Sequence, residues 1–225
     1  EVRYIQIGQR PVMLIRRFDR YWAAPGELPA VSTALHDTRP APALTEGRLP
    51  YVSGLTLVAC SEFESRNKGY HDLAHAIRQY VHPSRIQVDS EELFARLVFN
   101  IFVSNDDDHL RNHGFLWDPR LPGWRLSPLY DVLPRASHAT ERFLHLGVGP
   151  QGRLATLDNA LASHAQFTLS KAEAAQMMAQ VWQTVRAWKV YFEQFGVTDT
   201  EIGKIAPAFR HLDDVSTPEL RKLLP

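Results

Sequence analysis

The pattern of apolar and polar positions at the start of the chain is typical of two short strands. Large and polar side chains alternate over residues 4–8, a Gln-Arg-Pro turn follows at 9–11, and an apolar run covers 12–15. This pattern predicts a β-hairpin. Prolines then recur over residues 23–50, and because proline fixes φ and removes a backbone donor, we expect a long irregular loop there, of a length that is often functional.

The periodicity becomes helical beyond this loop. Helices are predicted over 54–60 with Ser53 as N-cap, over 70–80, and over 91–103 with Ser90 as N-cap. In the third helix apolar side chains recur at helical spacing, which predicts a buried helix: Leu93, Phe94, Leu97, Val98, Ile101 and Phe102.

The second half of the chain combines short strands with further helices. Strand-like pieces at 114–117 and 124–126 flank a turn with two prolines and a glycine, and another strand is predicted at 143–148. The remainder has helical patterns: 157–165, 170–194, 198–211 and a last turn or two after Pro218. We divide the chain into a strand pair at 1–22, the loop at 23–50 and one domain at 51–225.

The composition excludes several classes of protein. The chain has 225 residues, 44% hydrophobic and 22% charged, which is enough for one packed core. Its 25 basic and 25 acidic residues balance, so no overall field would draw it onto nucleic acid or an anionic membrane. The apolar runs are too short to span a membrane, and the single Cys60, expected in the core, excludes a disulfide framework and a multi-cysteine zinc site. We therefore expect a soluble, intracellular protein.

Three consecutive aspartates at 106–108 follow the predicted buried helix. Adjacent carboxylates repel each other, so a cation or hydrogen-bond donors are expected beside them. Asp107 and Asn112 also stand in the order Asp-x-x-x-x-Asn, the interval of a protein-kinase catalytic loop, where the Asp accepts the hydroxyl proton and the Asn holds a metal ion. A hairpin later, Asp131 has the place of a second metal-binding aspartate, within Tyr-Asp-Val rather than Asp-Phe-Gly. On spacing alone, a capped helix end with an acidic turn explains these residues equally well.

Two stretches carry a resemblance to a known family. They are Val-Phe-Asn-Ile-Phe-Val-Ser-Asn-Asp-Asp-Asp-His-Leu-Arg-Asn-His-Gly-Phe-Leu at 98–116 and Trp-Arg-Leu-Ser-Pro-Leu-Tyr-Asp-Val-Leu-Pro at 124–134. The chain resembles the carboxy-terminal domain of HipA-type serine/threonine kinases, the toxins of bacterial toxin–antitoxin systems. Weaker similarity at 17–20, at 48–57 and in the helical tail extends the resemblance over nearly the whole chain. It implies an α+β fold, the mostly helical large lobe of a protein kinase, with a strand and hinge remnant of the small lobe at 1–22.

The resemblance also implies roles for individual residues. Asp107 matches the catalytic aspartate of the family, and Asn112 and Asp131 match its Mg²⁺ ligands. The implied nucleotide contacts come from the hinge, whose main chain receives the adenine, and from two loops: Arg16, Arg17, Phe18, His109, Leu110, Arg111, Asn112, Tyr130 and Asp131.

The resemblance further implies cofactors and partners. The family transfers the γ-phosphate of ATP to a serine or threonine, and at least some members modify an aminoacyl-tRNA synthetase. Its antitoxin is a small helix-turn-helix protein. For this chain we therefore expect ATP and Mg²⁺ as cofactors, a protein substrate, an antitoxin, contact with DNA only through that antitoxin, no membrane partner and a cytoplasmic location.

One departure concerns the lysine that pairs the nucleotide phosphates in the family's small lobe. That lobe should precede the hinge, yet only 15 residues precede Arg16 and the first lysine is Lys68. Either the small lobe is removed, disordered or supplied by another chain, or the kinase is degenerate. Because Glu1 opens on strand-like sequence, we expect removal or absence of the small lobe, and we expect this piece alone to be weakly active or inactive. The family often has Glu in place of Arg16, a change that main-chain hinge contacts tolerate.

Two other functions stay open. A kinase-shaped lobe could serve only as a binding module that docks an antitoxin or another protein, and it would then need neither nucleotide nor Mg²⁺. A metal-dependent phosphohydrolase would use residues 106–109 on a water nucleophile and release phosphate without a protein acceptor.

Residues near the acidic loop have structural interpretations beside functional ones. We expect His109 to orient the catalytic aspartate by a hydrogen bond. Arg111 is expected at a phosphate or paired with Asp106 or Asp108. These two aspartates are expected to stabilise the turn or to lie at its surface, without a catalytic role, and His113 to be a buried support for the loop. Elsewhere, three histidines are a weak candidate for a metal pair: His71, His75 and His82. A set of aromatic residues is expected in the core: Trp182, Trp188, Tyr191 and Phe195.

Overall fold

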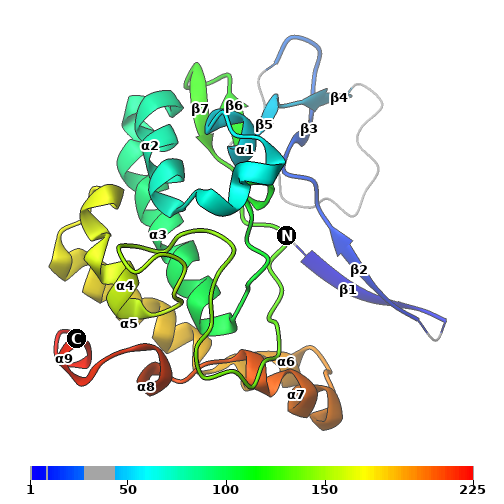
Figure 1. Ribbon diagram of the computed structural model, residues 1–225. Coiled ribbons are helices and arrows are strands. Elements are labelled where there is room, and N and C mark those ends of the chain that lie inside the picture. Colours follow the sequence, from blue (N-terminus) through cyan, green and yellow to red (C-terminus); the bar gives the residue numbers. More distant parts are fainter. Residues whose placement is uncertain (1, 9, 28–43, 225) are drawn as a thin grey trace.

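The computed structural model describes residues 2–8, 10–27 and 44–224, in which short antiparallel strands precede and interrupt a mainly helical body (Figure 1). The strands are β1 (Val2–Ile7), β2 (Arg10–Ile15), β3 (Arg20–Ala23), β4 (Thr45–Arg48), β5 (Tyr51–Ser53), β6 (Gly114–Asp118) and β7 (Gly123–Leu126). The α-helices are α1 (Gly54–Leu57), α2 (Tyr70–Tyr80), α3 (Ile86–Val103), α4 (Leu157–Ala162), α5 (Lys171–Val185), α6 (Trp188–Gln194), α7 (Asp199–Ile205), α8 (Leu212–Val215) and α9 (Pro218–Arg221). Five 3-10 turns lie between them: η1 (Glu62–Asn67), η2 (Pro83–Arg85), η3 (Leu110–Asn112), η4 (His164–Phe167) and η5 (Ala206–Ala208).

The predicted hairpin is confirmed as the β1–β2 ribbon, which extends away from the helices (Figure 1). Its register pairs Val2 with Ile15 and Tyr4 with Met13. Directly opposed residues share one face of a sheet, so these four apolar side chains lie on the same side of the ribbon. Each of them is more than half exposed, between 55% and 61%.

The prediction of an irregular loop over 23–50 is wrong at the two ends of that range, where strands are found. β3 and β4 pair in antiparallel register, with Arg20 opposite Arg48 and Ala23 opposite Thr45. Gly47 permits this pairing because a Cβ atom there would lie 2.2 Å from the ring of Tyr21. Residues 28–43 of the predicted loop lie outside the described residues.

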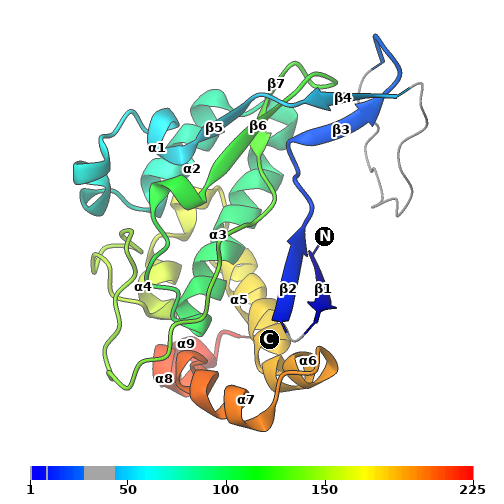
Figure 2. The ribbon, with the colours of Figure 1, turned by 90° about the vertical axis from the view of Figure 1, so that its right-hand side faces the viewer.

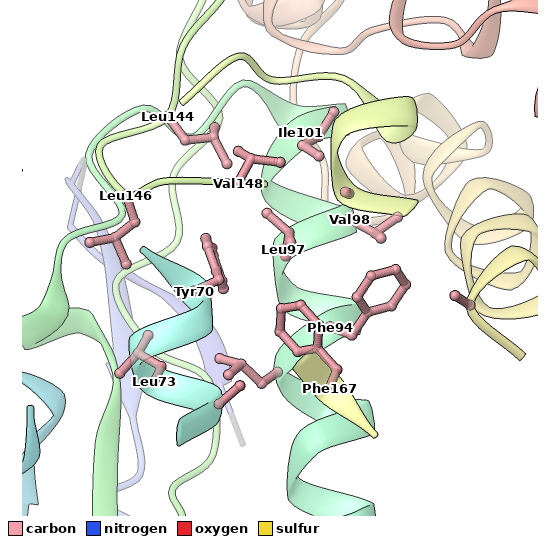
Figure 3. Packing of buried hydrophobic residues seen from close by; sticks show 14 of the residues in the cluster. Tyr70, Leu73, Phe94, Leu97, Val98, Ile101, Leu144, Leu146, Val148 and Phe167 are labelled. Carbon is pink, nitrogen blue, oxygen red and sulfur yellow. The ribbon is translucent and has the colours of Figure 1, made fainter. Parts of the chain in front are cut away.

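The core is built around α3, against which α2, α4 and α5 pack (Figure 2). Buried side chains from α2, α3, η4 and the segment at 144–148 interlock in Figure 3: Tyr70, Leu73, Phe94, Leu97, Val98, Ile101, Leu144, Leu146, Val148 and Phe167. The rings of Phe94 and Phe167 meet edge to face at 5.1 Å. Each fully buried large side chain contributes about 1.5–3 kcal/mol, so α3 is firmly fixed where the acidic loop leaves its carboxyl end.

The predicted start of this central helix is wrong. α3 begins at Ile86, and Ser90, the expected N-cap, is fully buried inside it. The carboxylate of Asp89 accepts hydrogen bonds from Arg85 (2.8 Å) and from the main-chain N–H of Leu126 (2.7 Å). Because Leu126 is distant in sequence, the local Ser-Glu pattern could not reveal that the first turn is stabilised from outside the helix.

Two neighbouring predictions are confirmed in part. Ser53 is the N-cap of α1, and its hydroxyl accepts a hydrogen bond from the N–H of Thr56. This helix ends at Leu57, earlier than predicted, since Ala59 adopts a left-handed conformation (φ +52°). Cys60 lies beyond the helix and packs partly buried against the core.

The strand predicted at 143–148 is wrong, although its alternation is real. Leu144, Leu146 and Val148 are buried, but among the described residues the segment forms only isolated bridges, Gly69 to Gly147 and Phe143 to Leu154. The alternation therefore reports which side chains are buried, without a partner strand for the backbone. By contrast, the strands predicted at 114–117 and 124–126 are confirmed as β6 and β7, in a sheet of order β5-β6-β7.

The single helix predicted at 170–194 is two helices, α5 and α6. The N–H of Ala187 turns back to Thr184 (3.2 Å), which tightens the chain, and the ring of Trp188 stacks on Phe209 at 4.0 Å. The next predicted helix, 198–211, is replaced by α7 and η5, because Pro207 has no N–H to continue the α-helical pattern.

The aromatic set of this region is only partly in the core. Trp182 packs against it and stacks on Phe102 at 5.3 Å, whereas Tyr191 and Phe195 are 46% and 69% exposed, so the core prediction is wrong for those two. No helix of the described residues is long and apolar enough to cross a membrane.

Candidate active site

The acidic loop starts from a sharp turn at the end of α3. Ser104 has a left-handed conformation (φ +53°), and its hydroxyl donates a hydrogen bond of 2.8 Å to the carbonyl oxygen of Ala208. The next residue, Asn105, is bound twice to Asn100 of the last helical turn, through its N–H (3.0 Å) and its side-chain amide (3.1 Å). The loop therefore leaves the core at a fixed point and in a fixed direction.

The structure brings Asp107 and Asn112 together. The side-chain amide of Asn112 donates a hydrogen bond of 3.0 Å to the carbonyl oxygen of Asp107, and the N–H of Asn112 binds the carbonyl oxygen of His109 at 2.8 Å. Asn112 is buried, whereas Asp107 is exposed. A general base needs this combination of a fixed backbone and an accessible carboxylate.

Tyr130 holds the second predicted metal loop against the first. Its hydroxyl donates to the carbonyl oxygen of Arg111 at 2.5 Å and lies 2.6 Å from the hydroxyl of Tyr51 on β5. Burial raises the pKa of Tyr130 far above its usual value, so the hydroxyl keeps its proton and remains a donor. Asp131 follows directly, exposed and in a left-handed conformation (φ +54°).

Phe18 of the predicted hinge lies beside Tyr130 and Tyr51. Its ring centroid lies 5.6 Å from that of Tyr130 and 6.4 Å from that of Tyr51. Arg17 points elsewhere, since its guanidinium forms a 2.7 Å ion pair with Asp19 and its side chain is 66% exposed. Arg16 is half-buried directly after β2. The side chain of Phe18 thus joins the loop cluster, whereas that of Arg17 is paired with Asp19.

The remaining predicted nucleotide contacts are less direct. The side chain of Leu110 is fully buried in the core, so only its main chain could face a nucleotide. Arg111 is paired with Glu62 of η1 at 2.8 Å, which corrects the expected pairing with Asp106 or Asp108.

His109 does not bind Asp107 in the way we expected. The hydrogen bond between them runs from the N–H of His109 to the carbonyl oxygen of Asp107 (3.0 Å), while the imidazole meets His145 edge to face at 5.8 Å. Its Nδ1 atom is buried and has no hydrogen-bond partner among the residues that the structure describes. Burial and the nearby His109 lower the pKa of His145, so this second imidazole tends to stay neutral.

The outer two aspartates have opposite surroundings. Asp106 is at the surface, as expected, and pairs with Arg135 at 2.9 Å. Asp108 is 2% exposed, so of the two expectations for it the surface position is wrong, whereas a role in stabilising the turn agrees with its burial. Its carboxylate lies 3.0 Å from Nε2 of His113, which is itself fully buried, as predicted.

The donor atoms fit a magnesium ion rather than a zinc ion. Because the amide nitrogen of Asn112 is occupied by Asp107, its Oδ1 is the atom left to act as a ligand, and Asp131 offers an exposed carboxylate. Among the described residues no group of three or more His, Cys, Asp or Glu side chains is placed to hold a metal ion, and this includes the histidine set of residues 71–82.

Sequence reasoning missed Tyr51, Glu62, His145 and Tyr70 as members of this region. The partners of the first three, Tyr130, Arg111 and His109, are distant in the sequence, and no motif joins them. The only available signal was the weak similarity of 48–57, which contains Tyr51.

Comparisons with known proteins bear on this geometry. The family model described as the HipA-like C-terminal domain matches residues 1–189. A search of curated proteins found no match.

One solved structure with a similar fold is that of the Shewanella oneidensis MR-1 toxin–antitoxin system, a complex of HipA, HipB and operator DNA. The match has a TM-score of 0.64 and 14% sequence identity, and it covers 92% of this chain and 48% of that one. The chain thus spans about half the length of this relative, and the likeness supports an α+β, mostly helical fold.

Proposed function

Because the chain belongs to the family of HipA-like C-terminal domains, we propose that it forms the large lobe of an ATP- and Mg²⁺-dependent serine/threonine protein kinase, the toxin of a bacterial toxin–antitoxin system. The observation that carries the proposal is the pair of contacts that assembles the loops. Asn112 binds the backbone of Asp107 at 3.0 Å, and Tyr130 binds the backbone of Arg111 at 2.5 Å. These contacts support the proposal that the base Asp107 and the metal ligands Asn112 and Asp131 act together from neighbouring loops.

In the proposed reaction, the hydroxyl oxygen of a serine or threonine on the substrate protein forms a bond to the γ-phosphorus of ATP. The bond between that phosphorus and the β–γ bridging oxygen breaks, and ADP leaves with the electron pair. Asp107 orients the hydroxyl and accepts its proton. Mg²⁺, when bound, supplies positive charge against the phosphate oxygens, and Asn112 and Asp131 are the residues that would hold it.

The main chain at residues 16–18 is the proposed adenine site, with the ring of Phe18 at its edge. The phosphates need a further cation, and this chain spans only about half the length of the similar HipA structure. We assign this role to a small lobe that packs on the exposed apolar side of the β1–β2 ribbon, formed by Val2, Tyr4, Met13 and Ile15. Without that lobe, transition-state stabilisation would be incomplete, and activity weak or absent.

The partners follow from the family and from the complex of the similar structure. We propose a helix-turn-helix antitoxin as the binding partner, with operator DNA contacted only through it, and a cytoplasmic location. The substrate class is a protein with an accessible serine or threonine, of which an aminoacyl-tRNA synthetase is one candidate.

Binding of ATP with Mg²⁺ to the complete product of the gene tests the proposal by calorimetry. We expect binding that requires Mg²⁺ and weakens in Asp131→Asn, whereas a pure docking module would bind neither nucleotide nor metal. In a separate incubation with γ-labelled ATP, release of labelled inorganic phosphate without labelling of any protein would instead favour a phosphohydrolase. Glu219→Gln, an exposed carboxylate on α9, is the matched control and should bind like the wild type.

A further inference from the structure

A buried polar cluster lies beneath the acidic loop. The carboxylate of Asp108 is 3.0 Å from Nε2 of His113, and its other oxygen accepts a hydrogen bond from the hydroxyl of Tyr70. The side-chain amide of Asn100 donates to the same hydroxyl at 2.9 Å. All four side chains are at most 3% exposed, so water cannot replace these partners.

The sequence positions of Asp108 and His113 connect this pair to the candidate active site. Asp108 directly follows the proposed base Asp107, and His113 directly follows the proposed metal ligand Asn112. The contact between Asp108 and His113 therefore closes the loop from both ends. It acts together with the hydrogen bond from Asn112 to the carbonyl oxygen of Asp107, which closes the same loop on its outer side.

The cluster also anchors the loop to the core. Tyr70 is the first residue of α2, Asn100 lies in the last turns of α3, and the ring of Tyr70 meets the imidazole of His113 edge to face at 5.5 Å. Burial raises the pKa of Asp108, but the charge of His113 and hydrogen bonds from Tyr70 and Asn100 outweigh it and hold that pKa below its usual value. Removing the carboxylate of Asp108 would take this partner from both His113 and Tyr70, which are buried, and that is far more destabilising than the loss of an exposed pair.

We propose that Asp108 and His113 are positioning residues that fix the distance between the base and the metal-ligating asparagine, with Tyr70 as their anchor in the core. The importance of that distance for catalysis rests on the proposed kinase function. We call the contact between Asp108 and His113, together with its anchor Tyr70, the clamp. The clamp is a property of the folded chain and can be measured without any activity.

Amide hydrogen exchange of the chain, followed by mass spectrometry, tests the clamp. In Asp108→Asn we expect peptides covering 104–114 to exchange at least about 10-fold faster, with the centre of α3 still protected, because the loop opens locally. Asp106→Asn makes the same chemical change two residues earlier at an exposed ion pair, and it should exchange like the wild type. Equal exchange of the loop in all three proteins would overturn the proposal.

A milder variant keeps the test decisive if Asp108→Asn does not fold. Tyr70→Phe removes only the hydroxyl and retains the ring in the core, so the loop should exchange faster by about 3-fold or more while the fold persists. Unchanged exchange in Tyr70→Phe would remove the anchor from the proposal.

Kinetics separate the clamp from a merely structural role. The kinetic comparison uses the complete gene product. In its folded Asp108→Asn variant, kcat should fall about 10-fold or more while the KM for ATP stays within about 2-fold, since the nucleotide is held elsewhere. A folded variant with wild-type kcat would show that the pair serves stability alone. If the wild type transfers no phosphate at all, the proposed function fails, and the exchange experiment still decides whether the clamp exists.

Discussion

The side-chain amide of Asn112 donates a 3.0 Å hydrogen bond to the carbonyl oxygen of Asp107, which joins the proposed metal ligand to the backbone of the proposed base. The bond uses the nitrogen of the amide and leaves its oxygen for a cation. One asparagine can therefore shape the loop and hold a metal ion at the same time.

Replacing Asn112 by alanine should weaken divalent metal binding. The variant loses the ligand oxygen and the bond that orders the loop, so we expect the apparent affinity for Mg²⁺ in the presence of ATP to fall about 10–100-fold. Titration with Mn²⁺ as a paramagnetic substitute for Mg²⁺, followed by electron paramagnetic resonance, measures the metal affinity. Gln176→Ala, which removes an exposed amide on α5, should have no effect. Equal metal affinity of both variants would contradict the assignment of Asn112.

Replacing Tyr130 by phenylalanine should loosen the contact between the two loops. The carbonyl oxygen of Arg111 loses its donor, and Tyr51 loses its partner. We expect the free energy of unfolding to fall by about 0.5–1.5 kcal/mol in urea denaturation. The matched control, Tyr191→Phe on the exposed side of α6, should change it by less than about 0.5 kcal/mol. Equal stability of the two variants would argue against the Tyr130 contact.

Truncating Leu97 at the centre of α3 should destabilise the whole domain. This side chain is fully buried, and a leucine-to-alanine change at such a site costs about 2–5 kcal/mol because a cavity remains. Val88→Ala, in the same helix but 47% exposed, should cost less than about 1 kcal/mol. Thermal and urea unfolding of the two variants compare them, and similar losses would contradict the central place of α3.

Acid should remove a contribution of Asp118 to stability. Hydrogen bonds from Arg120 lower the pKa of this buried carboxyl to about 2 from the ordinary value of 3.8. Its contribution is therefore complete above the unfolded pKa and is lost as the pH falls through the folded one. We expect the wild type to lose up to about 2 kcal/mol more than Asp118→Asn between about pH 5 and about pH 2. Parallel stability curves in urea titrations would show that the Asp118 cluster contributes nothing.

Local patterns predicted the elements whose determinants are local. The helix over 70–80 is confirmed residue for residue as α2, and the Asp-x-x-x-x-Asn interval identified a loop in which Asp107 and Asn112 do meet. Both signals lie within a dozen neighbouring residues. The roles of these residues as base and metal ligand stay predictions.

Features that depend on distant partners could not be predicted. Ser90 was a plausible N-cap by sequence, but the contact of Asp89 with Leu126 extends α3 by a turn. Nothing around Asp108 distinguishes it from Asp106, since its burial arises from Tyr70, which lies on another helix. The alternation at 143–148 likewise identified buried side chains, but it could not show that the segment forms only isolated bridges within the described part of the chain.

Transfer of labelled γ-phosphate from ATP tests the central claim most directly. The complete gene product and its Asp107→Asn variant are incubated with Mg²⁺ and cell extract, with Asp106→Asn as the matched control. The wild type and the control should label serine or threonine on protein, and Asp107→Asn should be at least about 100-fold slower. Undiminished transfer by Asp107→Asn would contradict the assignment of the base. The absence of transfer and of nucleotide binding from all three proteins would leave a kinase-shaped docking module.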